Sequence, residues 1–182
     1  MTITPHREDA PDAGSAKAAQ LILEDRARVL AQPTVPDTDG DALVLLSFTV
    51  AGRAYAIEVI HIREVLARAD VSRLPWAPPA MAGVINVRGE IVAVADAARV
   101  LGMGDTGSDG PVIVLDGGGH PLGLRVHAVD AITTITSTRL VAPEVDRAAG
   151  DLVLGLTSSA VVLDPRALYA DPRLTNHPQE PT

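Results

Sequence analysis

The stretch from Gly83 to Asp96 reads GVINVRGEIVAVAD, and it decides the fold predicted for this chain. Two runs rich in β-branched residues, Val84–Val87 and Ile91–Ala95, flank the charged turn Arg88-Gly89-Glu90. Because glycine takes a positive φ without steric cost, this composition is typical of a β-hairpin that carries charged side chains into water. The stretch holds no nucleophile, metal cage or phosphate loop. It therefore predicts a surface for recognition rather than a site for catalysis.

The composition limits the possible classes of protein. Of the 182 residues, 47% are hydrophobic and 2% aromatic, so a core can form but must consist mainly of aliphatic side chains. The net charge of −8 and the scarcity of aromatic rings argue against a nucleic-acid partner. The absence of cysteine excludes disulfides, thiolate metal sites and cysteine nucleophiles. With no signal peptide and no apolar run long enough to cross a bilayer, we expect a soluble cytoplasmic protein without membrane insertion.

The distribution of residue types along the chain predicts five segments. Residues 1–16 are expected to form a flexible tail, 17–32 an amphipathic helix and 33–41 a linker. A folded body of two lobes is expected from 42 to 170, and a second flexible tail from 171 to 182. The apolar face of the helix suits docking on the folded body and docking on a partner equally well.

Within the folded body, short apolar runs at close spacing predict a mainly β protein with a barrel or sandwich architecture. The other predicted strands are Leu43–Val50, Ala54–Ile57, Pro111–Leu115, Pro121–Val129, Ala131–Ile135, Leu152–Leu156 and Ala160–Leu163. A helix is predicted at Val59–Leu66, because its apolar residues recur at helical spacing. A helical turn is expected at Pro165–Tyr169.

The ordered series of motifs from Leu43 to Tyr169 resembles the CheW-like family, the coupling proteins of bacterial chemotaxis. The motifs that carry the resemblance are Ser47–Val50, Tyr55–Val59, Ile62–Leu66, Leu74-Pro75, Gly83–Gly89, Leu122–Leu124 and Val162–Asp164. The resemblance implies two small five-stranded SH3-like β-barrels that share a hydrophobic core, with an N-terminal helix and short helices, and without catalysis or cofactor. It also implies an adaptor that couples the cytoplasmic tips of chemoreceptors (methyl-accepting chemotaxis proteins) to the regulatory domain of a CheA-type histidine kinase.

The same resemblance implies where partners bind. Arg88 and Glu64 match family positions at the receptor-facing surface, and Ile62, Val65 and Val87 are their apolar neighbours. The predicted partner-binding surface comprises Arg88, Glu64, Val87, Ile62, Val65, Asn86 and Gly89.

One pattern suggests an enzyme instead. Asp105-Thr106-Gly107-Ser108 spells the active-site tetrad of aspartic proteases, so the alternative function is an aspartic protease-like homodimer that uses Asp105. That chemistry needs two aspartates that share a proton, each at the end of an apolar strand. Here Gly102-Met103-Gly104 precedes the tetrad, and the chain has no second copy. A loop is therefore the preferred interpretation.

Two further patterns are interpreted as structural. Asp116-Gly117-Gly118-Gly119 precedes a predicted strand, whereas a phosphate-binding loop opens a helix, so a hairpin turn is favoured. The candidate metal ligands show no ligand spacing, and no metal site is predicted from them; they are His61, His120, His127, Asp96 and Asp130.

Overall fold

The computed structural model describes residues 41–105, 107, 109–116, 119–142 and 150–174. All of them belong to one compact unit, Pro36–Thr182. The predicted tail at 1–16, the predicted helix at 17–32, residues 33–40 of the linker and residues 175–182 lie outside the described residues.

The described residues form two five-stranded sheets and a few short helices, which confirms the predicted mainly β fold. The first sheet has the strand order β8-β1-β2-β10-β9, and the second has the order β3-β6-β7-β5-β4. The first sheet consists of β1 (Ala42–Val50), β2 (Arg53–Glu58), β8 (Ala128–Thr136), β9 (Val153–Leu156) and β10 (Val161–Leu163). The second consists of β3 (Ile62–Leu66), β4 (Met81–Val87), β5 (Glu90–Asp96), β6 (Val112–Leu115) and β7 (Leu122–Arg125).

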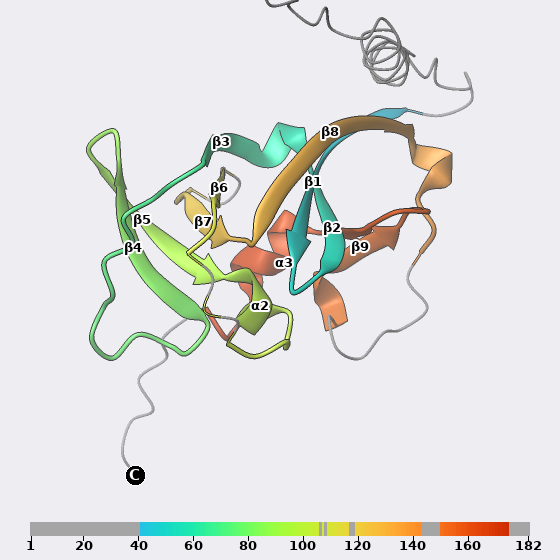
Figure 1. Cartoon of the computed structure of the whole chain (residues 1–182). Helices are drawn as coiled ribbons and strands as arrows, with labels where there is room; N and C mark the ends of the chain where they lie inside the picture. The colour runs from blue at the N-terminus through green and yellow to red at the C-terminus, as the bar shows by residue number, and fades with distance from the viewer. Residues whose placement is uncertain (1–40, 106, 108, 117–118, 143–149, 175–182) are drawn as a thin grey trace, which may run out of the picture. The chain divides into compact units, whose positions relative to one another are not determined.

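The chain passes from the first sheet to the second and back once (Figure 1). It leaves the first sheet after β2 through the 3-10 turn η1 (Val59–His61) and returns after β7 at Val126 and His127. The other helices among the described residues are α2 (Ala97–Val100), η2 (Ser137–Arg139), η3 (Gly150–Leu152) and α3 (Pro165–Ala170). The second sheet is thus one uninterrupted segment, whereas the first is assembled from both ends of the folded body.

Each sheet is closed into a barrel by one isolated β-bridge between its two edges. Beyond the edge strand β3 the chain reaches Ser72, which pairs with Val84 of β4 through N–O distances of 2.9 and 2.8 Å. Beyond the edge strand β8 it reaches Val141, which pairs with Leu156 of β9 through N–O distances of 2.9 and 2.8 Å. Each bridge adds two backbone hydrogen bonds between the edges of its sheet.

A glycine precedes the bridging residue in each receiving strand. Gly83 has φ +148°, and a Cβ atom there would overlap the carbonyl group of Ser72. A Cβ atom on Gly155 would lie 2.5 Å from Cγ of Leu140 and 3.0 Å from the carbonyl oxygen of Val141. The crossing segment therefore approaches each edge strand so closely that only glycine leaves room for it.

Three clusters of buried side chains hold the unit together. Ile85, Val87, Val92, Val94, Val112 and Val114 fill the second barrel. Leu45, Ala56 and Val162 fill the first. The largest cluster combines Phe48 and Ile57 of the first sheet with Ile113 and Leu124 of the second, so the predicted shared core lies between the two barrels. The hydroxyl of Tyr169, a residue of α3, donates to the carbonyl oxygen of Leu115 at 2.9 Å and ties the last helix to the second sheet.

The predicted helix at Val59–Leu66 is wrong. Only η1 is helical, and Ile62–Leu66 forms the edge strand β3. The pairing with β6 contains a β-bulge, since Ile62 pairs with Leu115 and Glu64 with Val114. Burial still alternates along β3, but Glu64 stands at a half-buried position and Val65 at an exposed one. The polarity of the sequence therefore does not follow the alternation, which explains its apparent helical period.

Two other boundaries differ from the prediction. The predicted strand Pro121–Val129 is two strands, because the chain changes sheets at Val126 and His127. Residues 171–174, predicted to begin a flexible tail, belong to the folded unit: the side chain of Asp171 is 1% exposed, and Leu174 packs against the shared core.

We expect Gly83→Ala to lower the free energy of unfolding by about 3 kcal/mol or more, because it adds a Cβ atom where Ser72 already lies and strains the backbone. Gly52→Ala is the matched control, since Gly52 also has a positive φ (+77°) but no atom within 4 Å of its Cβ position. We expect it to cost about 1 kcal/mol. Urea unfolding of the two variants measures the difference; equal losses would contradict a close approach of Ser72 to Gly83.

The stability of the fold should depend on the ionisation of Asp171. Burial raises the pKa of this carboxyl, but hydrogen bonds from the side chain and backbone N–H of Arg173 outweigh burial, and the pKa lies below its ordinary value. A lowered pKa stabilises the folded state above the unfolded-state pKa of about 4, and this stabilisation is lost as the pH falls further. We therefore expect wild type to be more stable than Asp171→Asn at pH 7, with the difference shrinking below about pH 4. Denaturant midpoints measured against pH test this, and a constant difference would contradict it.

Candidate functional site

Arg88 and Gly89 are the two central residues of the tight turn between β4 and β5. Their φ values are +54° and +92°, as a type I′ hairpin turn requires. The side-chain oxygen of Asn86 accepts a hydrogen bond from the N–H of Gly89 at 2.8 Å, which fixes the turn. A positive φ is unfavourable for arginine, whereas glycine tolerates it. The turn therefore holds Arg88 in a strained but well-defined position.

Two ion pairs connect this turn to the edge strand β3. Nη2 of Arg88 lies 3.2 Å from Oε2 of Glu64, and Nη1 of Arg63 lies 2.6 Å from Oε2 of Glu90. The hydrogen bond to Glu90 raises the pKa of Arg63. Glu64 therefore lies on a strand, not on the helix edge predicted for it, and the structure brings it together with Arg88 across the line where the second barrel closes.

The predicted surface residues divide into exposed and supporting groups. The side chain of Arg88 is 78% exposed and that of Glu64 is 18% exposed, so the pair presents mainly the guanidinium. Val65 and Asn86 are also exposed. Val87 is only 3% exposed and belongs to the core of the second barrel, and its prediction as a surface contact is therefore wrong. Ile62 is half-buried and packs against the shared core.

Ile91 is a surface residue that the sequence interpretation missed. It pairs with Asn86 across the hairpin and is 64% exposed. The alternation of β5 contains the signal, because Val92 and Val94 are buried and their neighbours point the other way. Arg88, Glu64, Val65, Asn86 and Ile91 form what we call the Arg88 surface. It combines one exposed cation with separated aliphatic side chains, which is a chemistry for contact with another protein.

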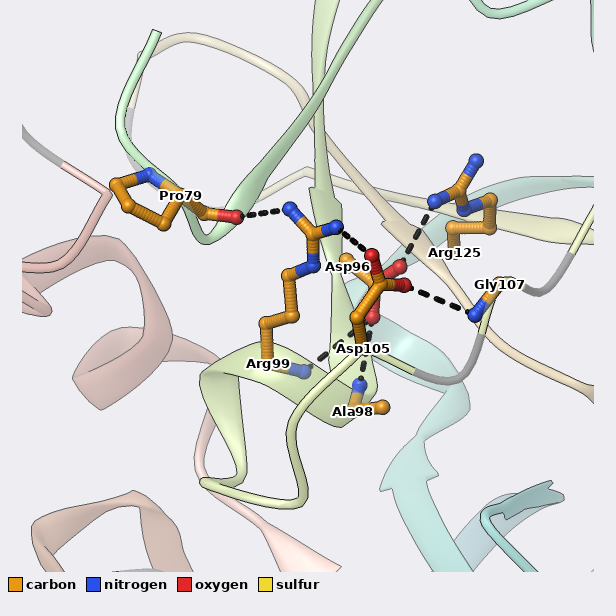
Figure 2. A network of polar contacts seen from close by, with 7 residues as sticks. All are labelled: Pro79, Asp96, Ala98, Arg99, Asp105, Gly107 and Arg125. Atoms are coloured by element: carbon orange, nitrogen blue, oxygen red, sulfur yellow. Dashed lines mark hydrogen bonds and ion pairs between the residues drawn. The ribbon is translucent and has the colours of Figure 1, made fainter.

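A second group of charges lies where β5 ends (Figure 2). Asp96 is buried, accepts hydrogen bonds from the N–H groups of Ala98 and Arg99 at 3.1 and 3.3 Å, and so caps α2. Its other oxygen pairs with Nη2 of Arg125 at 2.8 Å. Asp96 and Arg125 are register partners on the parallel strands β5 and β7. The Asp96–Arg125 pair therefore holds a central strand pair and a helix start together.

The environment of Asp105 does not suit protease chemistry. Its carboxylate forms an ion pair with Arg99 and accepts a hydrogen bond from the N–H of Gly107 at 2.9 Å. The backbone N–H of Gly107 and the side chain of Arg99 lower the pKa of Asp105 below its ordinary value. A proton-sharing aspartate pair needs one carboxyl whose pKa is raised. Thr106 and Ser108 of the tetrad lie outside the described residues.

The other candidate motifs have structural surroundings. Asp116 and Gly119 lie between β6 and β7, with residues 117 and 118 outside the described part of the chain. Nδ1 of His127 accepts a hydrogen bond from the N–H of Ala51 at 3.2 Å, next to the β1–β2 turn. Among the described residues, no three histidine or carboxylate side chains gather as metal ligands. Nor does any described helix have the length and apolarity to span a bilayer.

Comparison with known proteins identifies relatives of this folded unit. Residues 44–173 match the model of the CheW-like domain family. A probable chemotaxis protein CheW of Rhizobium etli is 31% identical over 94 residues, which are 50% of this chain and 61% of that protein. The chemotaxis protein CheW of Rhizobium meliloti is 30% identical over 107 residues, 58% of this chain and 68% of that protein. The chemotaxis protein CheW of Thermotoga maritima is 31% identical over 97 residues, 53% of this chain and 64% of that protein.

A solved structure has the same fold. The scaffolding protein TtCheW of Thermoanaerobacter tengcongensis superposes with a TM-score of 0.64 at 24% identity, over 68% of this chain and 90% of that one. The similarity in sequence is less extensive, since this chain spans less than two thirds of the length of the R. etli and T. maritima relatives.

We expect the two charge clusters to differ in their importance for stability. Arg88→Ala should change the free energy of unfolding by less than about 1 kcal/mol, because an exposed ion pair is screened by water. Asp96→Ala should lower it by about 3 to 5 kcal/mol, because it leaves the mostly buried Arg125 without its partner and removes the cap of α2. Chemical denaturation measures both, and a large loss in Arg88→Ala would show that the Arg88–Glu64 pair is a structural element.

Proposed function

The chain belongs to the CheW-like domain family, and on that basis we propose that it is a non-enzymatic adaptor that couples chemoreceptors to a CheA-type histidine kinase. The observation that carries this proposal is the family match over residues 44–173, which covers both barrels. The names of the relatives, chemotaxis protein CheW, support a role in chemotaxis-like signal transduction.

The Arg88 surface is our candidate for contact with the cytoplasmic tip of the receptor. Arg88 occupies a left-handed backbone position, and such strain costs about 1 kcal/mol. Strained positions of this kind cluster at functional sites, because the surrounding structure holds the side chain in a fixed place. The hydrogen bond from Gly89 to Asn86 and the ion pair with Glu64 supply that support.

The geometry of the Arg88 surface supports a proposal about the chemistry of its partner. A guanidinium presents a planar fork of N–H donors, and only Nη2 of Arg88 contacts Glu64. The remaining donors can bind a carboxylate of the partner, while Val65 and Ile91 contact aliphatic side chains around it. An acidic, partly apolar surface on the receptor fits this description.

A cytoplasmic location follows from the same proposal, since the receptor tips and the kinase that it would join are cytoplasmic. The alternative of an aspartic protease-like homodimer has no supporting observation in the structure. Asp105 is held by Arg99 and Gly107 in its charged form, which suits a loop anchor rather than a shared proton.

We expect wild type to bind both a chemoreceptor cytoplasmic fragment and the cognate kinase at micromolar concentration, and Arg88→Glu to weaken receptor binding at least tenfold. The reversal replaces the exposed cation with an anion that repels the partner's carboxylate. Arg53→Glu is the matched control, because it changes the charge by the same amount at an exposed hairpin of the first sheet. Pull-down and titration calorimetry with purified components measure these affinities.

The double variant Glu64→Arg/Arg88→Glu separates partner contact from internal pairing. It restores an ion pair across the closure of the second barrel but leaves no cation in the turn. Receptor binding that stays weak in this variant supports contact through Arg88, whereas full recovery would assign the effect to the internal pair. Failure of the wild type to bind either partner would refute the adaptor function, and peptide cleavage at acid pH that is lost in Asp105→Ala would support the alternative.

A further inference from the structure

Three arginines line one small cavity next to the loop that precedes β4. The cavity has a volume of about 150 Å³, and Arg73, Arg99 and Arg125 contribute to its wall. The rest of its lining is apolar and includes Leu74 and Met81. Among the described residues no carboxylate lines it, although the chain as a whole has a net charge of −8. Three cationic side chains at one cavity of an acidic protein are a candidate site for binding an anion.

The charges around this cavity are incompletely balanced. Nη2 of Arg125 pairs with Asp96, and Arg99 pairs with Asp105 and donates to the carbonyl oxygen of Pro79 at 2.6 Å (Figure 2). Arg73 has no ion-pair partner among the described residues. Arginine stays protonated at any physiological pH. The three arginines that line the cavity and the two aspartates paired with them therefore sum to a net charge of +1.

One donor of the group is buried without a partner. Nε of Arg125 has no hydrogen-bond acceptor among the described residues, and the side chain of Arg125 is only 16% exposed. Burying a charged donor without an acceptor is unfavourable, so native structures provide an acceptor from the protein, water or a bound ion. Nε is itself inaccessible to solvent, so its missing acceptor shows only that the guanidinium of Arg125 is incompletely paired.

A neighbouring hollow differs from this cavity in the charges that line it. It has a volume of about 280 Å³ and shares Arg73 and Arg125 with the first cavity. Asp70 and Asp109 also line it. These two carboxylates would repel an anion in the hollow. An anion is therefore favoured in the first cavity, which no described carboxylate lines.

We propose that the cavity lined by Arg73, Arg99 and Arg125 binds a small free oxyanion of the phosphate or sulfate type. The volume of the cavity suits such an ion. Planar guanidinium groups match tetrahedral oxyanions through paired N–H donors. Because the wall combines residues from the loop before β4, from α2 and from β7, a bound oxyanion would connect these segments and stabilise the second barrel.

The test is titration of the full chain with inorganic phosphate at constant ionic strength, with sodium chloride as the matched salt. We expect saturable binding by calorimetry and a higher melting temperature in phosphate than in chloride. Arg73→Gln should weaken phosphate binding about tenfold or more, because it removes one charge-assisted contact. Arg68→Gln is the control, since Arg68 is exposed and does not line the cavity; its affinity should equal that of wild type.

Three results would overturn the proposal. The first is a response to phosphate that does not exceed the response to chloride. The second is wild-type affinity in Arg73→Gln, and the third is an equal loss in Arg73→Gln and Arg68→Gln, which would assign binding to general electrostatics. Arg73 has no ion-pair partner in the part of the chain that the structure describes, so we expect its replacement to leave the fold intact and each result to be interpretable. Receptor and kinase binding is measured separately, so loss of the adaptor function does not affect the outcome.

Discussion

The architecture depends on two places where the backbone passes within contact distance of a glycine. Each sheet becomes a barrel because a crossing segment bridges its two edges through a single residue pair, Ser72–Val84 in one barrel and Val141–Leu156 in the other. At both places the residue before the bridge has no side chain, and a Cβ atom would collide with the crossing segment. Both sheets thus close on themselves at a glycine instead of remaining open at their edges. Closure therefore requires glycine at these two positions.

The Arg88 surface follows from the closure of the second barrel. Glu64 lies on one edge strand and Arg88 on the hairpin at the other edge, so only a closed sheet brings them within 3.2 Å. The second pair, Arg63 with Glu90, spans the same edges in the opposite charge order. Beneath these charges, Val87 and Ile85 fill the barrel and keep the hairpin in place. The exposed cation is therefore supported by the most constrained part of the fold.

The sequence predicts local features of this protein better than it predicts pairings over long distances. The hairpin around Arg88 is predictable, because turn residues and β-branched runs act within a few positions of each other. The strand at Ile62–Leu66 is not, because its half-buried Glu64 pairs with the distant Arg88 while its Val65 is exposed, which hides the two-residue alternation. Val87 could have been assigned to the core from alternation alone, since Asn86 and Arg88 on either side are exposed. The Asp96–Arg125 pair joins residues 29 positions apart on two parallel strands, and no local sequence pattern predicts it.

The path of the chain also has a consequence for how the protein folds during synthesis. All strands of the second barrel lie between Ile62 and Arg125, so this barrel can complete its pairing from one continuous segment. The first barrel needs β1 to meet β8, and the contact of Ser47 with Ala131 joins positions 84 residues apart. Pairing across so long an intervening segment is slow to form from an open chain. Once the second barrel has formed, it brings the end of β2 close to the start of β8. The strands of the first barrel can then pair over a much shorter effective distance.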